Sequence, residues 1–153
     1  MERLLENRLF GMSARDYLSC MESPLLINFI VLFIASAMEL SGFQEERYDM
    51  MKSFYIVSTT LLPVYAGILV YKKNGEILNS ITAGAIYALL APTITVLFGL
   101  LLGYGIDELE NFQRYYTTYL TRSCVLAPLG YFIGMAVDRY KTGALPRKLI
   151  FKK

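Results

Sequence analysis

Four long apolar runs alternate with short polar segments along the chain, at residues 24–43, 53–71, 81–104 and 119–137. Each run is close to the ~20 residues that cross a lipid bilayer as a helix. The third run is the longest, with 24 residues and no charged side chain. This pattern predicts an all-α integral membrane protein in which four transmembrane helices form a bundle over residues 24–138.

Small side chains recur every three or four residues in the third and fourth runs, which puts them on one face of each helix. They are Gly84, Ala88, Ala91, Thr95, Gly99 and Gly103 in the third run, and Ser123, Ala127, Gly130 and Gly134 in the fourth. Small faces let helix backbones approach closely in lipid. We therefore expect the third and fourth helices to form the closest pair, with Gly99 level with Ser123. Self-association of two copies through the GxxxG pairs, Gly99 with Gly103 and Gly130 with Gly134, is the alternative.

Prolines interrupt the middle of three runs, at Pro63, Pro92 and Pro128. Proline removes a backbone hydrogen bond and kinks a helix, so three kinks at one level would open a cavity in the bundle. Asn28 and Thr59 are the polar residues that we expect to line it. The alternative is that the prolines are simply tolerated, because neighbouring helices satisfy the freed backbone groups.

Two charged residues, Glu39 and Arg122, fall inside the apolar runs. A charge in the bilayer interior costs about 2.5–3.5 kcal/mol on insertion scales, so each requires a partner or a function. Both lie about 5 Å from the same predicted membrane face, and we expect an ion pair between the first and last helices. Separate snorkelling to the surface is the alternative. Four spans with a glutamate in the first also resemble the architecture of the small multidrug transporters, and this resemblance implies a proton or cation site at Glu39.

Lysine and arginine are concentrated on one predicted side of the membrane. Eleven precede the first run, separate the second from the third, or follow the fourth, whereas four fall elsewhere. By the positive-inside rule both termini are cytoplasmic, and we expect the plasma membrane as the location. The basic tail, residues 139–153, is expected to bind anionic lipid headgroups. Its basic residues are Arg139, Lys141, Arg147, Lys148, Lys152 and Lys153.

Residues 1–23 carry leucines at helical spacing and a capping-box pattern formed by Ser13 and Asp16. This pattern predicts an amphipathic helix that lies on the cytoplasmic face of the membrane. The first span is then expected to begin at Pro24, with Ser23 as its N-cap.

Composition narrows the function classes. The chain is 55% hydrophobic and 18% charged, it has no histidine, and its only cysteines are Cys20 and Cys124. It carries no motif for a catalytic nucleophile, a metal or a phosphate group. We therefore expect that the protein is not an enzyme and that it binds no cofactor, metal or nucleic acid.

The small-residue faces favour a non-enzymatic accessory or scaffold subunit of a membrane complex, or a self-assembling bundle. Its partners would be membrane lipid and either further copies or other membrane subunits. The alternative is a small solute or ion transporter or channel, with a cavity at the level of the prolines and with Glu39 and Arg122 as its charged groups.

Overall fold

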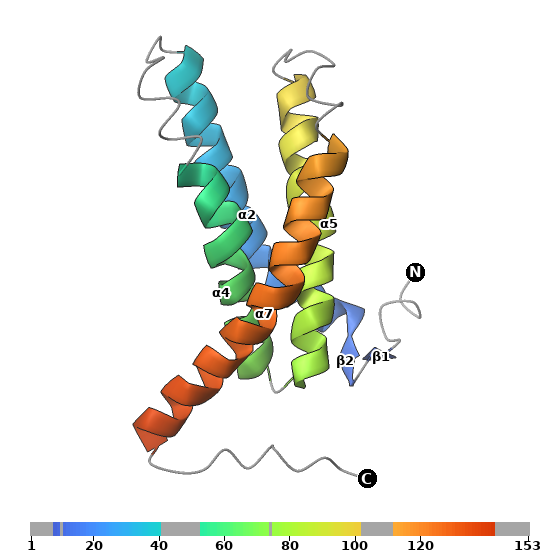
Figure 1. The fold of residues 1–153 in the computed structure, drawn as a ribbon, viewed down its shortest axis with the longest axis vertical. Helices are drawn as coiled ribbons and strands as arrows, with labels where there is room; N and C mark the ends of the chain where they lie inside the picture. Colours follow the sequence, from blue (N-terminus) through green and yellow to red (C-terminus); the bar gives the residue numbers. More distant parts are fainter. Residues whose placement is uncertain (1–7, 10, 41–52, 74, 102–111, 143–153) are drawn as a thin grey trace.

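The computed structural model describes residues 8, 9, 11–40, 53–73, 75–101 and 112–142 (Figure 1). Two short strands, β1 (Arg8–Leu9) and β2 (Met12–Ser13), lead into helix α2 (Ala14–Leu40). The next span contains a π-helical segment, η1 (Val57–Leu61), which continues as α4 (Leu62–Lys72). The last two helices are α5 (Ile77–Leu101) and α7 (Phe112–Thr142).

Four of the helical segments are long and apolar enough to cross a membrane. They are Ala14–Met38, Ser53–Lys72, Ile77–Leu101 and Tyr116–Lys141. The prediction of a helical chain with four such segments is therefore confirmed.

The helices expose apolar side chains on their outer faces and bury several polar side chains between them. Leu26, Phe33, Leu89 and Leu97 are each 56% exposed on the outer surface. The fully buried polar side chains are Asn28, Ser58, Thr59, Asn79, Ser80 and Ser123. A soluble protein has the opposite distribution, so the exposed apolar faces agree with the four helices long and apolar enough to cross a membrane.

Helix α2 begins ten residues earlier than the sequence predicts. The Ser13 hydroxyl accepts a hydrogen bond from the Asp16 backbone N–H (3.2 Å), and the Asp16 carboxylate accepts one from the Ser13 N–H (3.1 Å). The predicted capping box is therefore confirmed. Gly11, with φ of +86°, makes the left-handed turn between β1 and β2. Pro24 lies inside the helix, so Ser23 is not an N-cap.

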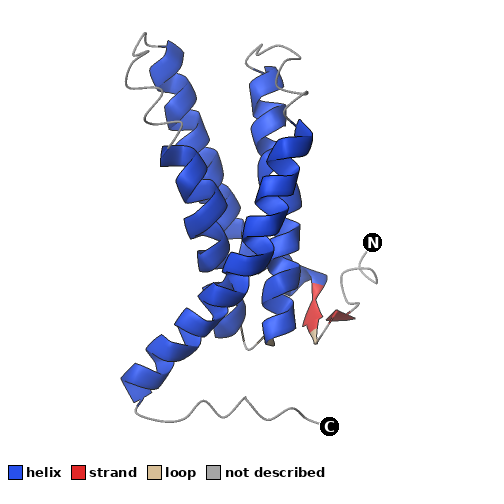
Figure 2. Cartoon of the chain, viewed as in Figure 1, coloured by secondary structure: helices blue, strands red, loops and turns tan. Residues whose placement is uncertain are grey.

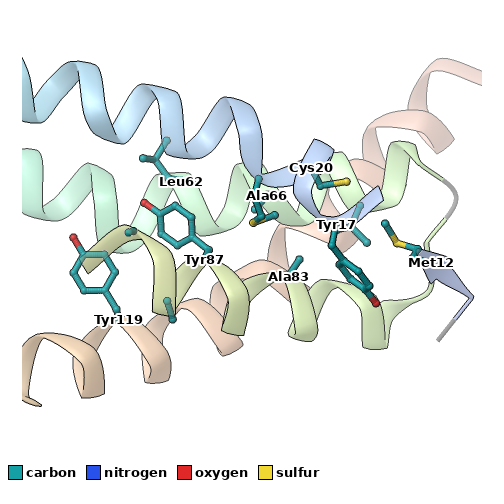
Figure 3. Close-up of a cluster of buried hydrophobic side chains, with 12 residues drawn as sticks. Met12, Tyr17, Cys20, Leu62, Ala66, Ala83, Tyr87 and Tyr119 are labelled. Atoms are coloured by element: carbon teal, nitrogen blue, oxygen red, sulfur yellow. The ribbon is translucent and has the colours of Figure 1, made fainter. Parts of the chain in front are cut away.

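The first part of α2 belongs to the bundle core. Tyr17, Cys20 and Met21 are at most 3% exposed and pack in one cluster with Ala66 and Ala83 (Figure 3). Residues 14–23 are thus the first turns of α2 rather than a separate helix, and their apolar face is covered by other helices. Their expected position on the membrane face stays a prediction. Residues 1–7 and 10 lie outside the described part of the chain.

Helices α4 and α5 contact each other, and each also contacts both α2 and α7. Helices α2 and α5 run away from the end of the bundle that carries the β1–β2 hairpin, which we name the hairpin end, towards the far end (Figure 2). Helices α4 and α7 run in the reverse direction. The last turns of α7 extend past the other helices at the hairpin end, where Tyr140 is 92% exposed (Figure 1).

Glycines bring α4 and α7 together as a parallel pair. A Cβ added at Gly67 would overlap the backbone carbonyl of Ala127, and one added at Gly130 would overlap that of Val64. Between α5 and α7 the approach is less close, since a Cβ added at Gly84 would lie 2.5 Å from a carbonyl oxygen of α7. At the described glycines the second and fourth spans are therefore closest, not the third and fourth as predicted.

The contact between α5 and α7 also differs in depth from the prediction. Gly84 lies beside Ser123, whereas Gly99 is 15 residues, or about 22 Å, farther along α5. The period of small residues predicts which face of a helix is buried, but it contains no information on the depth at which two faces meet. Ala88 and Ala91 are buried, and Thr95 and Gly99 are half-buried.

The two GxxxG pairs have different outcomes. Gly130 faces α4, and a Cβ added at Gly134 would lie 3.0 Å from the ring of Tyr71, also in α4. Both glycines of this pair are therefore used in contacts within the chain. The other pair is Gly99 with Gly103, and Gly103 lies outside the described residues.

Candidate functional site

Four polar side chains, one from each span, meet in the middle of the bundle. They are Asn28 of α2, Ser58 of η1, Tyr87 of α5 and Tyr119 of α7, and we name them the central cluster. The Ser58 hydroxyl lies 2.5 Å from Asn28 Oδ1 and 2.6 Å from the Tyr119 hydroxyl. Asn28, Ser58 and Tyr87 are 0% exposed and Tyr119 is 3% exposed. The cluster is thus fully enclosed by the helices.

The backbone around Ser58 explains why the cluster forms there. The Leu62 N–H bonds to the Val57 carbonyl, five residues earlier, which is the hydrogen-bond pattern of a π-helix. In this pattern the Ser58 carbonyl would receive the N–H of residue 63, but Pro63 has none. The Tyr87 hydroxyl donates to this carbonyl instead, at 2.9 Å. A proline in one helix therefore creates the need for a hydroxyl from another.

The two tyrosines approach the cluster together. Their ring centroids are 6.4 Å apart, and the ring planes are inclined at 35°. Figure 3 shows both hydroxyl groups directed to the side of α2 and α4. Nearer the hairpin end, Leu62, Ala66 and Ala83 belong to the apolar core. The rings therefore form one wall of the central cluster.

An arginine lies next to the central cluster. Arg122 Nη1 donates to the Thr59 hydroxyl (3.1 Å), and its guanidinium carbon is 5.4 Å from the centroid of the Tyr55 ring. Thr59 donates to the Tyr55 carbonyl at 2.6 Å, so its oxygen is free to accept the arginine N–H. A hydrogen bond and a cation–π contact thus hold the Arg122 side chain. Thr59, which accepts that hydrogen bond, is the residue after Ser58.

Further buried polar atoms lie between the cluster and the hairpin end. The Ser123 hydroxyl, one turn along α7 from Tyr119, has no partner among the described residues. Asn79 is eight residues before Tyr87, about 12 Å nearer the hairpin end, and its amide nitrogen and oxygen also lack partners there. The same holds for the amide nitrogen of Asn28. An unpaired buried polar group costs about 1–3 kcal/mol, so these atoms call for water or a ligand.

The structure places the three central prolines at different heights. With ~1.5 Å per residue measured from the cluster residue of the same helix, Pro92 lies about 7 Å towards the far end. Pro63 and Pro128 lie about 7 Å and 13 Å towards the hairpin end. The three prolines therefore do not share a level, as a common cavity at their height would require. Asn28 and Thr59, which were expected at that level, are instead at and beside the central cluster.

The other predicted residues are only partly described. Glu39 is in the last turn of α2 and its side chain lies outside the described part, so its ion pair with Arg122 and its proposed proton or cation site stay predictions. Arg139 and Lys141 are exposed in the last turns of α7. The remaining basic residues of the tail, Arg147, Lys148, Lys152 and Lys153, lie outside the described residues.

Sequence reasoning missed Ser58, Tyr87, Tyr119 and Gly67 as members of the bundle centre. A signal was present for the two tyrosines. Tyr87 stands three residues after Gly84, and Tyr119 stands four residues before Ser123, so each extends a face of small residues. A large hydroxyl-bearing side chain on such a face must enter the space that the small residues leave.

Comparison of the sequence with models of protein families, with curated proteins and with solved structures finds no match.

Proposed function

We propose that this protein is a non-enzymatic membrane transport protein, a carrier or channel for a small polar solute, with the central cluster as its binding site. One observation carries the proposal: hydroxyl and amide groups from all four spans converge in the bundle, and the Asn28 amide nitrogen there has no partner among the described residues. Unpaired polar groups are expensive in lipid. Where such groups face the bundle interior, they mark solute and ion pathways.

Further polar groups beside the cluster and towards the hairpin end, all of them buried except the exposed Arg122, support a path rather than an isolated contact. Thr59 and the Arg122 guanidinium lie beside it, and Ser123 and Asn79 follow towards the hairpin end. A solute would meet hydrogen-bonding groups over about 12 Å, the length of α5 between Asn79 and Tyr87. A purely structural helix contact would leave no reason for the unpaired atoms.

The predicted role as an accessory or scaffold subunit required small-residue faces that are not used in contacts within the chain and are therefore available to a partner. Gly67, Gly84, Gly130 and Gly134 all contact other helices of the same chain. They therefore provide no argument for a partner, and we place transport first. Assembly with further copies or other membrane subunits stays a separate prediction, which the mass of the detergent-solubilised particle tests.

We further propose that both termini are cytoplasmic and that the membrane is the plasma membrane. Support comes from the hairpin end, which carries Arg15, Lys72, Lys73, Arg139 and Lys141. Because Arg139 and Lys141 are exposed, they are available to anionic headgroups, each with roughly 1 kcal/mol of attraction.

Water access to the centre tests the transport function. Single cysteines replace Ser58 or Ser123 in a chain whose Cys20 and Cys124 are changed to alanine, and a water-soluble methanethiosulfonate is added to proteoliposomes. We expect both positions to react, because a solute path must be hydrated. Ala88→Cys is the control, since Ala88 is also fully buried and has no polar role. If S58C and S123C are as inert as A88C, the proposed function is wrong.

Solute movement is then measured directly by osmotic swelling of proteoliposomes in urea and in glycerol. The protein should speed swelling relative to protein-free liposomes, and Ser58→Leu, which fills the cluster, should abolish the gain. Leu89→Val, a change on the lipid-facing side, should have no effect. Far-UV circular dichroism checks that each variant keeps its helices.

A further inference from the structure

The hydrogen-bond directions in the central cluster can be assigned by counting protons. Ser58 has one hydroxyl proton, and it is donated to Asn28 Oδ1. Tyr119 must therefore donate to the Ser58 hydroxyl oxygen, since that contact is 2.6 Å long and Ser58 has no second proton. Tyr87 donates to the Ser58 carbonyl. All three hydroxyl protons are thus used within the cluster.

The chain of donors ends on the amide of Asn28. Its oxygen accepts from Ser58, while both N–H groups of its nitrogen are buried without a partner among the described residues. What the cluster lacks is an acceptor. A cation bound at the amide nitrogen would be opposed by its two N–H donors, whereas a ligand with an acceptor oxygen would satisfy them.

The positive charge of Arg122, beside the cluster, also favours a ligand that accepts hydrogen bonds. Arg122 can donate five N–H bonds, and the one described hydrogen bond is that to Thr59. The acidic side chains that the structure describes, Asp16, Glu22, Glu76 and Asp138, all lie on the hairpin-end side of the cluster. Within the described residues, a positive charge is therefore bonded to Thr59, the neighbour of Ser58 in the chain, and no described carboxylate lies at its height.

On the basis of the proposed transport function, we propose that the solute is a small monocarboxylate. Its carboxylate would accept hydrogen bonds from the unpaired N–H groups of Asn28 and would be attracted by the positive charge of Arg122. A single arginine balances a single negative charge, which distinguishes a monocarboxylate from a dicarboxylate. Hydrogen bonds to a charged acceptor are roughly twice as strong as neutral ones, so the unpaired amide gains most from this class of ligand.

Uptake of radiolabelled pyruvate into proteoliposomes tests the assignment, with the neutral pyruvamide as the matched comparison. We expect pyruvate to enter at least about tenfold faster than into protein-free liposomes, and pyruvamide to compete weakly. Asn28→Asp keeps the size of the side chain and replaces the N–H donors with a negative charge, so it should lower pyruvate uptake by about tenfold or more. R122Q should do the same, and R122K should retain part of the activity. The control is T121V, because the exposed Thr121 hydroxyl bonds to carbonyls of its own helix, those of Thr117 and Thr118.

The outcomes separate this inference from the function on which it rests. If urea or glycerol passes and S58C reacts, but pyruvate does not enter, the monocarboxylate assignment is wrong and transport stands. If pyruvate enters equally well with N28D and R122Q, the assigned residues are wrong. If no solute passes and S58C is inert, both proposals fall together.

Discussion

Replacing Tyr87 with phenylalanine removes the donor that serves the Ser58 carbonyl at 2.9 Å. Hydrogen bonds between membrane helices contribute about 0.6 kcal/mol on average and up to about 1.7 kcal/mol. The carbonyl left unpaired in the bundle adds a penalty of about 1–3 kcal/mol. We therefore expect Y87F to lower the free energy of unfolding by about 2–3 kcal/mol.

Pro63→Ala tests whether the missing backbone N–H of Pro63 is the reason that the Ser58 carbonyl needs the Tyr87 hydroxyl. Alanine supplies residue 63 with an N–H that can bond to the Ser58 carbonyl along the helix. In the P63A background, Y87F should therefore cost about 1 kcal/mol or less, which corresponds to a coupling energy of about 1–2 kcal/mol in the double-mutant cycle.

The free energy of unfolding is measured by far-UV circular dichroism in mixed micelles of dodecyl maltoside and SDS. The control is Tyr140→Phe, since Tyr140 is 92% exposed, and we expect a change within about 0.5 kcal/mol. An equal cost of Y87F with and without P63A would refute the account of the central cluster, because the tyrosine would then not be replacing a missing backbone donor.

Two further predictions use the same unfolding measurement. Alanine at Gly67 or Gly130 should destabilise the bundle by about 3 kcal/mol or more, and at Gly84 by less, because the added methyl group meets backbone atoms. Gly134→Ala should be nearly neutral, since the Tyr71 ring can move and the helix-propensity gain is about 1 kcal/mol; a reversed ranking would contradict the packing described above. Ser13→Ala should cost about 1 kcal/mol through loss of the capping box, whereas Thr121→Val, which removes a hydroxyl bonded within its own helix, should cost less.

The spans were predictable from the sequence because each one is a local property of about 20 residues. The start of α2 shows the limit of this reasoning. The capping box at Ser13 was visible, but Pro24 looked like a better start, since proline is common at the first position of a helix. The start of the helix depends on the burial of Tyr17 and Met21 against other helices, and those helices come from distant parts of the chain.

The depth at which helices meet was not predictable for the same reason. The faces containing Gly84 and Ser123 were identified, but small residues recur along each face and allow several registers of similar appearance. The register is selected by contacts that occur once, such as the hydroxyls of Tyr87 and Tyr119 at Ser58. Residues that recur along a helix can specify which face is buried, but only contacts that occur once can specify the depth at which two helices meet.

The position of the candidate site follows from this distinction. Three prolines in the described helices, Pro63, Pro92 and Pro128, each stand five residues after a buried hydroxyl-bearing residue, namely Ser58, Tyr87 and Ser123. In the second span the proline leaves the Ser58 carbonyl without a backbone donor, and a hydroxyl from the third span is needed to satisfy it. Because lipid offers no competing hydrogen bonds, that need draws polar groups of all four spans to one height. The same step that sets the register thus assembles the polar centre, and a change at Pro63 should alter stability and solute passage together.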